Sequence, residues 1–168
     1  MNAASDHDAV LARYKEGPAL LEQALAGLQD ADLDASPVQG GWTIRQITHH
    51  IADGDDLWKP GIKAALGNEE GEFTLEWYWS VPQQVWAERW NYAHRPLAPS
   101  IALFQATRDH VAQLMEQVTG AWTRTIGVRK PDGETEAISA GFIVGMQADH
   151  LEHHVAQILA IRGECGGA

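Results

Sequence analysis

Apolar residues recur every three or four positions in four long segments of the chain, and this spacing predicts four amphipathic helices. Acidic and amide residues fill the positions between them, as on helices that bury one face and expose the other. The four segments run over approximately residues 10–28, 44–67, 100–118 and 139–162.

The second of these segments has the clearest beginning. Thr43 stands directly before it and Gln46 follows three residues later, which is the pattern of a capping box. Trp42 and Ile47 occupy the positions of a hydrophobic staple. We expect the helix to kink or break at Pro60-Gly61, because proline removes a backbone donor.

Two connections are expected to carry structure of their own. Residues 68–96 hold four of the seven tryptophans, and Ser80-Val81-Pro82 is a plausible start for a short helix ending near Tyr92. This connection either forms the wall of a pocket or packs as an aromatic plug over the bundle. Before the last helix, alternating residues on both sides of Pro131-Asp132-Gly133 predict a small hairpin.

The pattern as a whole predicts an all-α fold: one four-helix-bundle domain spanning residues 1–168. It would have a long helical connection between its second and third helices and a small hairpin before its fourth. The length of 168 residues and the 45% of hydrophobic residues suit a single globular core, and no apolar run reaches the length of a membrane span.

Charge and cysteine content indicate which partners and which location in the cell to expect. A net charge of -11 with scattered Lys and Arg disfavours binding to nucleic acid or to an anionic membrane surface. The single cysteine, Cys165, can form no internal disulfide, and the N-terminus lacks the pattern of a secretory signal. A cytoplasmic location is therefore expected.

Histidines on the fourth helix are the first sign of chemistry. His150 and His154 are four residues apart, so they stack on the helix face that also carries Ile143 and Ile158. His153 lies about 100° away, at the edge of that face. Two imidazoles on a buried face either hold a metal ion or form hydrogen bonds within the core; alternatively, the spacing is a coincidence on the surface.

The second helix offers a third histidine. His50 falls on the apolar side of that helix, whereas His49 shares its row with Asp53 and Asp56 and is expected to be more solvated. Three inward imidazoles with a fourth position open are typical of a catalytic metal site. Zinc, nickel, copper and iron all bind such a donor set.

Two motifs resemble those of the DinB/YfiT-like family. In WTIRQITHHIAD, His50 stands directly before an apolar-Ala-Asp run, and in HLEHHVAQI the residues His150 and His154 match the second motif. The resemblance extends over nearly the whole chain. It implies a four-helix bundle around a divalent metal, often zinc or nickel, held by His50, His150 and His154, and frequently a homodimer.

The same resemblance implies one of two activities on a small-molecule substrate. Relatives include S-transferases that use a low-molecular-weight thiol as co-substrate and metal-dependent hydrolases. For a base or orienting group we favour Asp53, one helical turn after His50, over Glu152, which is expected to face solvent. The alternatives are a non-catalytic, metal-binding, stress-responsive dimer and a plain helical interaction domain.

Overall fold

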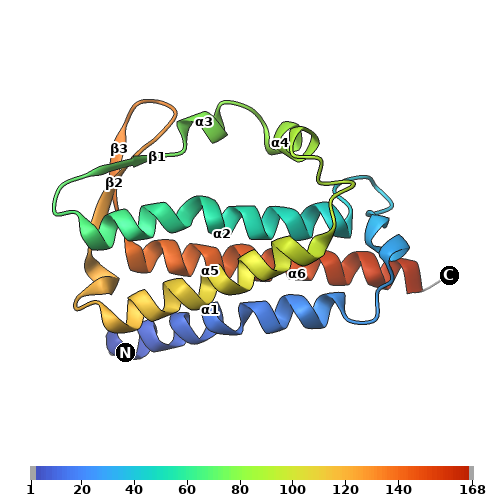
Figure 1. Ribbon diagram of the computed structural model, residues 1–168, viewed down its shortest axis with the longest axis horizontal. Coiled ribbons are helices and arrows are strands. Elements are labelled where there is room, and N and C mark those ends of the chain that lie inside the picture. The colour runs from blue at the N-terminus through green and yellow to red at the C-terminus, as the bar shows by residue number, and fades with distance from the viewer. Residues whose placement is uncertain (1–2, 167–168) are drawn as a thin grey trace.

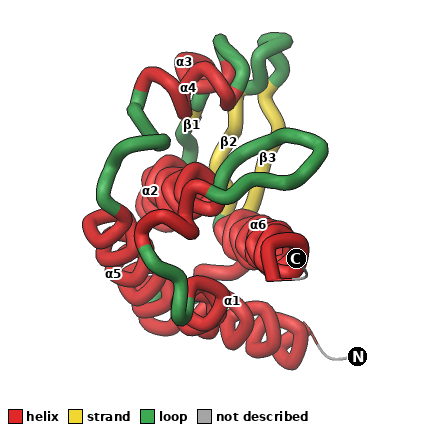
Figure 2. The backbone as a smooth tube through the Cα atoms, turned by 90° about the vertical axis from the view of Figure 1, so that its right-hand side faces the viewer, coloured by secondary structure: helices red, strands yellow, loops and turns green. Residues whose placement is uncertain are grey.

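Four long helices form the body of the molecule in the computed structural model, which describes residues 3–166, with side chains from residue 6 to residue 164. They lie side by side, and the view along them shows α1 and α2 at opposite corners, each flanked by α5 and α6 (Figures 1 and 2). The predicted four-helix bundle is thus confirmed. The helices are α1 (Ala3–Leu25), α2 (Ile44–Gly67), α5 (Leu97–Gln117) and α6 (Ala140–Gly166).

A three-stranded sheet lies against one end of α2, so the prediction of an all-α fold is incomplete (Figure 1). The expected hairpin is present as the antiparallel pair β2 (Thr125–Arg129) and β3 (Thr135–Ser139). The unexpected strand β1 (Glu72–Thr74) pairs in parallel with β2. Three residues are too few to show an alternating pattern, and their partners lie 55 residues further along the chain.

The tryptophan-rich connection covers α2 from outside the bundle (Figure 2). It contains two short helices, α3 (Glu76–Trp79) and α4 (Gln83–Arg89), where one helix was expected. Tyr78 stacks on both Trp86 and Trp90, with ring centroids 5.8 Å and 6.0 Å away. Two 3-10 turns, Asp30–Asp34 and Ala121–Thr123, complete the described elements.

Helix α2 begins as predicted but does not break. The Thr43 hydroxyl accepts from the backbone N–H of Gln46, and the Gln46 side chain accepts from the N–H of Thr43. Pro60 nevertheless lies inside a continuous helix. Ile62 and Ala65 just beyond it are fully buried, so packing on both sides of Pro60 offsets the lost hydrogen bond.

A buried ion pair separates the two halves of the hydrophobic core. The guanidinium of Arg108 on α5 bonds Asp55 of α2 at 2.7 Å, and also donates to the carbonyls of Tyr14 on α1 and Gln147 on α6. Along each long helix, one core cluster lies mainly before these residues and the other mainly after them. The contacts of Arg108 therefore join all four long helices at one level along the bundle axis.

None of the described helices is long and apolar enough to cross a membrane.

Gly17→Ala is expected to destabilise the protein by about 1–3 kcal/mol, although alanine favours helices more than glycine does. A Cβ at position 17 would lie 2.0 Å from the Arg108 Nη1 and 2.5 Å from a Leu151 methyl group. Urea denaturation measures the change. Gly163→Ala is the matched control, because nothing lies within 4 Å of a Cβ there. Equal stability of the two variants would contradict the packing assigned to Gly17.

Candidate metal site

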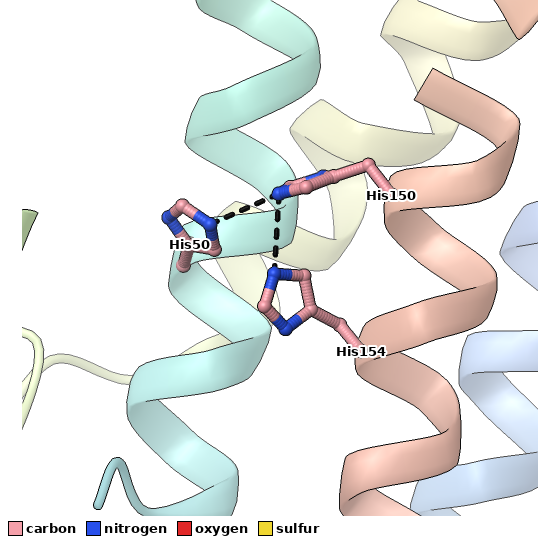
Figure 3. Close-up of side chains that lie close together, drawn as sticks. All are labelled: His50, His150 and His154. Carbon is pink, nitrogen blue, oxygen red and sulfur yellow. Dashed lines mark hydrogen bonds between the residues drawn. The ribbon is translucent and has the colours of Figure 1, made fainter. Parts of the chain in front are cut away.

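Three histidine side chains converge between α2 and α6 (Figure 3). The Nε2 of His150 lies 3.0 Å from the Nε2 of His50 and 3.2 Å from the Nε2 of His154. One nitrogen from each ring can be chosen so that all three lie within 4.8 Å of one another. The structure thus brings together all three histidines that the sequence predicted as metal ligands.

Burial keeps these imidazoles neutral. Burial, reinforced by charge repulsion from neighbouring histidines, lowers the pKa of His50 to about 3 and that of His150 to about 4. Burial also lowers the pKa of His154, against the effect of its hydrogen bond to Gln157. Neutral imidazole is the form that binds a metal ion, so the site is ready to do so at pH 7.

Hydrogen bonds fix where the lone pair of His154 points. Its Nδ1 lies 2.8 Å from the carbonyl oxygen of the Gln157 side chain, so Nδ1 carries the proton and Nε2 presents a lone pair to the cluster. The amide nitrogen of Gln157 in turn lies 3.1 Å from His153 Nε2. Gln157 was missed from the sequence, although its position three residues after His154 placed it on the same side of the helix.

No placement of protons gives every close contact between the ring nitrogens of the three histidines a full hydrogen bond. A ring nitrogen holds either a proton or a lone pair, and His150 Nε2 faces two other Nε2 atoms. One proton on His150 therefore leaves one of the two contacts without a full hydrogen bond. A cation among the three nitrogens satisfies every lone pair at once.

The spacing of the nitrogens also fits a metal ion. Nitrogen ligands about 2.0–2.1 Å from a tetrahedral zinc lie about 3.3 Å from each other. The two measured separations, 3.0 and 3.2 Å, are close to that value. Three neutral nitrogens leave further coordination positions for water or substrate, which is the arrangement of catalytic rather than structural sites.

His150 has one further unsatisfied atom. Its Nδ1 is buried without a hydrogen-bond partner, and so is the side-chain oxygen of Gln147, one helical turn earlier. Both groups lie against Gly54, where a Cβ would come within 3.1 Å of the His150 ring. The absence of a side chain at Gly54 leaves the room that the His150 ring occupies.

Two cavities flank the histidines. The larger, of about 580 Å³, has His154 in its wall together with Trp42, Ile47 and Gln157. The smaller, of about 130 Å³, has His50 and His150 in its wall. Gln83 of α4 lines both, so the tryptophan-rich connection forms part of the pocket wall as well as packing on α2.

Asp53, predicted as a base or orienting group, lies outside both cavities. Its carboxylate accepts a 2.5 Å hydrogen bond from the Tyr92 hydroxyl, and Arg95 lies 4.0 Å away. In this position it ties α2 to the end of the tryptophan-rich connection. Its catalytic role stays a prediction. Glu152, half exposed, pairs with Arg13 of α1.

The prediction that His49 is solvated was wrong. His49 is completely buried, with Nδ1 2.8 Å from the Ser100 hydroxyl and Nε2 3.1 Å from the Arg95 carbonyl. Helix α2 is covered by α5, α6, the sheet and the tryptophan-rich connection, so it has almost no solvent face. His49 therefore anchors the start of α5 rather than pairing with Asp53.

Comparison with known proteins confirms the resemblance seen in the two histidine motifs. The sequence model of the DinB superfamily matches residues 13–158. A protein of Geobacillus thermodenitrificans named "putative metal-dependent hydrolase" is 29% identical over 157 residues, which is 93% of this chain and 84% of the relative. A protein of Oceanobacillus iheyensis with the same name is 30% identical over 145 residues, covering 86% and 78% of the two chains.

A solved structure has the same fold. YfiT from Bacillus subtilis, described as a probable metal-dependent hydrolase with an unusual four-helix bundle topology, superposes with a TM-score of 0.83 at 25% identity. The match covers all of this chain and 92% of YfiT.

The metal-free protein is expected to lose stability as the pH falls from 7 to 5. In the folded protein the pKa values of His50 and His150, about 3 and about 4, lie below the ordinary 6.5. Between pH 7 and pH 5 the unfolded chain therefore binds protons at these histidines and the folded chain does not. The contribution of the two neutral histidines to the free energy of unfolding is complete above pH 6.5 and is lost as the pH falls toward 4. Each histidine contributes roughly 2 kcal/mol to the loss between pH 7 and pH 5.

Urea denaturation of chelator-treated protein at both pH values measures this loss. A His50→Gln/His150→Gln variant provides the comparison, since its stability should fall less over the same interval. An equal fall in both proteins would show that these histidines titrate normally.

Proposed function

Because this chain belongs to the DinB superfamily, we propose that it is a metal-dependent hydrolase in which His50, His150 and His154 hold one divalent transition metal. The observation that supports this most strongly is the convergence of three neutral imidazoles, two buried and one partly buried, whose contacts cannot all be satisfied by protons. The names of the relatives point to the same class of reaction.

The metal, when bound, lowers the pKa of a coordinated water to about 7 and so supplies a nucleophile at neutral pH. Gln157 holds the His154 ring so that Nε2 faces the site. Trp79 and Gln83 form part of the wall of the smaller cavity beside His50 and His150. Among the described residues, the smaller cavity has no carboxylate in its wall, so no acidic side chain is available there as a general base.

A thiol-dependent S-transferase is the second candidate, and the same lack of a carboxylate favours it. A thiol, with an ordinary pKa near 8.5, needs far less help to lose its proton than water does. The cavity walls then serve to place an electrophilic carbon against the thiolate. Zinc and nickel are the expected metals, and a homodimer remains a prediction for light scattering to test.

Purified protein carrying no metal-affinity tag should contain about one transition metal per chain by elemental analysis. His50→Ala, His150→Ala and His154→Ala should each lose most of it, because two imidazoles bind far more weakly than three. Loaded wild-type protein should then turn over members of an ester and amide panel, or join a thiol to an electrophile. Metal bound without any turnover would favour the non-catalytic, metal-binding alternative, and unchanged metal content in the three variants would refute the site.

Gln157→Leu should weaken metal binding by about 10- to 100-fold, because His154 loses the acceptor that fixes its tautomer and ring orientation. Competition with a chromogenic chelator measures the affinity. Gln84→Leu is the control, since Gln84 lines the larger cavity but is not a hydrogen-bond partner of His50, His150 or His154. Equal affinity of the two variants would show that Gln157 does not orient the ligand.

A further inference from the structure

The larger cavity beside His154 combines two kinds of wall. Ile47 of α2, Ile161 of α6 and Trp42, two residues before α2, supply apolar surface. Gln83, Gln84 and Gln157 supply side-chain amides from α4 and α6. Its volume of about 580 Å³ is in the range that holds a small organic molecule, whereas the 130 Å³ of the smaller cavity is not.

Charge is the most distinctive property of this cavity. No lysine or arginine is found among the residues that line it in the part of the chain with described side chains. Its one charged residue is acidic: Glu164, whose carboxylate accepts from the backbone N–H of Val38. An anionic group held here away from the histidines would lose its hydration, find no lysine or arginine on the wall, and face both Glu164 and a net charge of -11.

The amide side chains favour a different kind of group. Each primary amide both donates and accepts hydrogen bonds. Gln83 and Gln84, with the second N–H and second lone pair that Gln157 keeps beside its bonds to His153 and His154, therefore match amides and hydroxyls without requiring a charge. The apolar wall of Trp42 and Ile161 suits a short hydrocarbon segment next to such groups. His154 places the reacting end of the molecule at the histidine cluster.

We propose that this cavity binds the body of an uncharged substrate, one that carries amide or hydroxyl groups beside an apolar segment, and that it discriminates against anions. The inference rests on the proposed function, since it identifies the substrate class of that same site. It applies equally to a thiol co-substrate: an uncharged thiol fits, and a thiol bearing carboxylates does not.

Two thiols that differ only at the far end test this selectivity. In 6-mercaptohexanamide and 6-mercaptohexanoate the thiol can reach the metal, while six carbons keep the amide or carboxylate away from it. Each is titrated into zinc-loaded and metal-free protein at pH 7. The readout is the NMR shift of the backbone amides of Gly40 and Gly41 and the side-chain amides of Gln83 and Gln84, all in the cavity wall. The amide probe should bind at least about tenfold more tightly.

A matched pair of variants isolates the charge. Ala160→Arg places a cation in the cavity wall, and Ala156→Arg places the same cation on an exposed position of α6 outside it. Ala160→Arg should bring the affinities of the two probes close together or reverse their order. Ala156→Arg should leave the wild-type preference unchanged.

Each outcome bears on a separate claim. Equal or tighter binding of the carboxylate probe to wild-type protein would overturn the inference, as would the absence of shifts in the cavity wall. A protein that fails to bind zinc but still prefers the amide probe would refute the proposed metal function and leave the substrate class supported. Zinc binding with no preference between the probes would refute the substrate class and leave the proposed metal function supported.

Discussion

The buried ion pair between Arg108 and Asp55 is the constraint on which the rest of the structure depends. Removing two charges from water is costly, and the cost is offset only when every donor finds an acceptor. Each guanidinium nitrogen of Arg108 donates to a group on another long helix, and together these groups come from all three: the Asp55 carboxylate and the carbonyls of Tyr14 and Gln147. Its guanidinium also lies 4.3 Å above the Tyr14 ring. A shift of any helix along its axis would break one of these contacts.

This constraint also sets the geometry of the histidine cluster. His50 precedes Asp55 by five residues on α2, and His150 follows Gln147 by three residues on α6. The two helices run in opposite directions, so both histidines lie on the same side of the ion pair (Figure 1). Rigid helices transmit the position of the pair to the histidines over less than two turns. The nitrogens thus meet at 3.0–3.2 Å without any loop taking part.

The tryptophan-rich connection gives the site its chemical environment. The Tyr92–Asp53 hydrogen bond holds it on α2, and the stacking of Tyr78 with two tryptophans packs the connection together. Gln83 of this connection lines both cavities. The protein has a high net negative charge, yet the walls next to the histidines are almost free of charged groups. In such surroundings the positive charge of a metal ion is weakly screened and acts strongly on a polar bond held beside it.

The sequence by itself determined the four helices, the capped start at Thr43 and the inward phase of His50, His150 and His154. These follow from spacing along one helix, which needs no knowledge of any partner. Tertiary structure decided what each polar side chain meets. His49 is buried because α2 has neighbours on nearly every side, and Asp53 bonds Tyr92, 39 residues away. Pro60 stays helical and β1 finds its partner for the same reason: the stabilising contacts join segments far apart in the chain, where local periodicity carries no information.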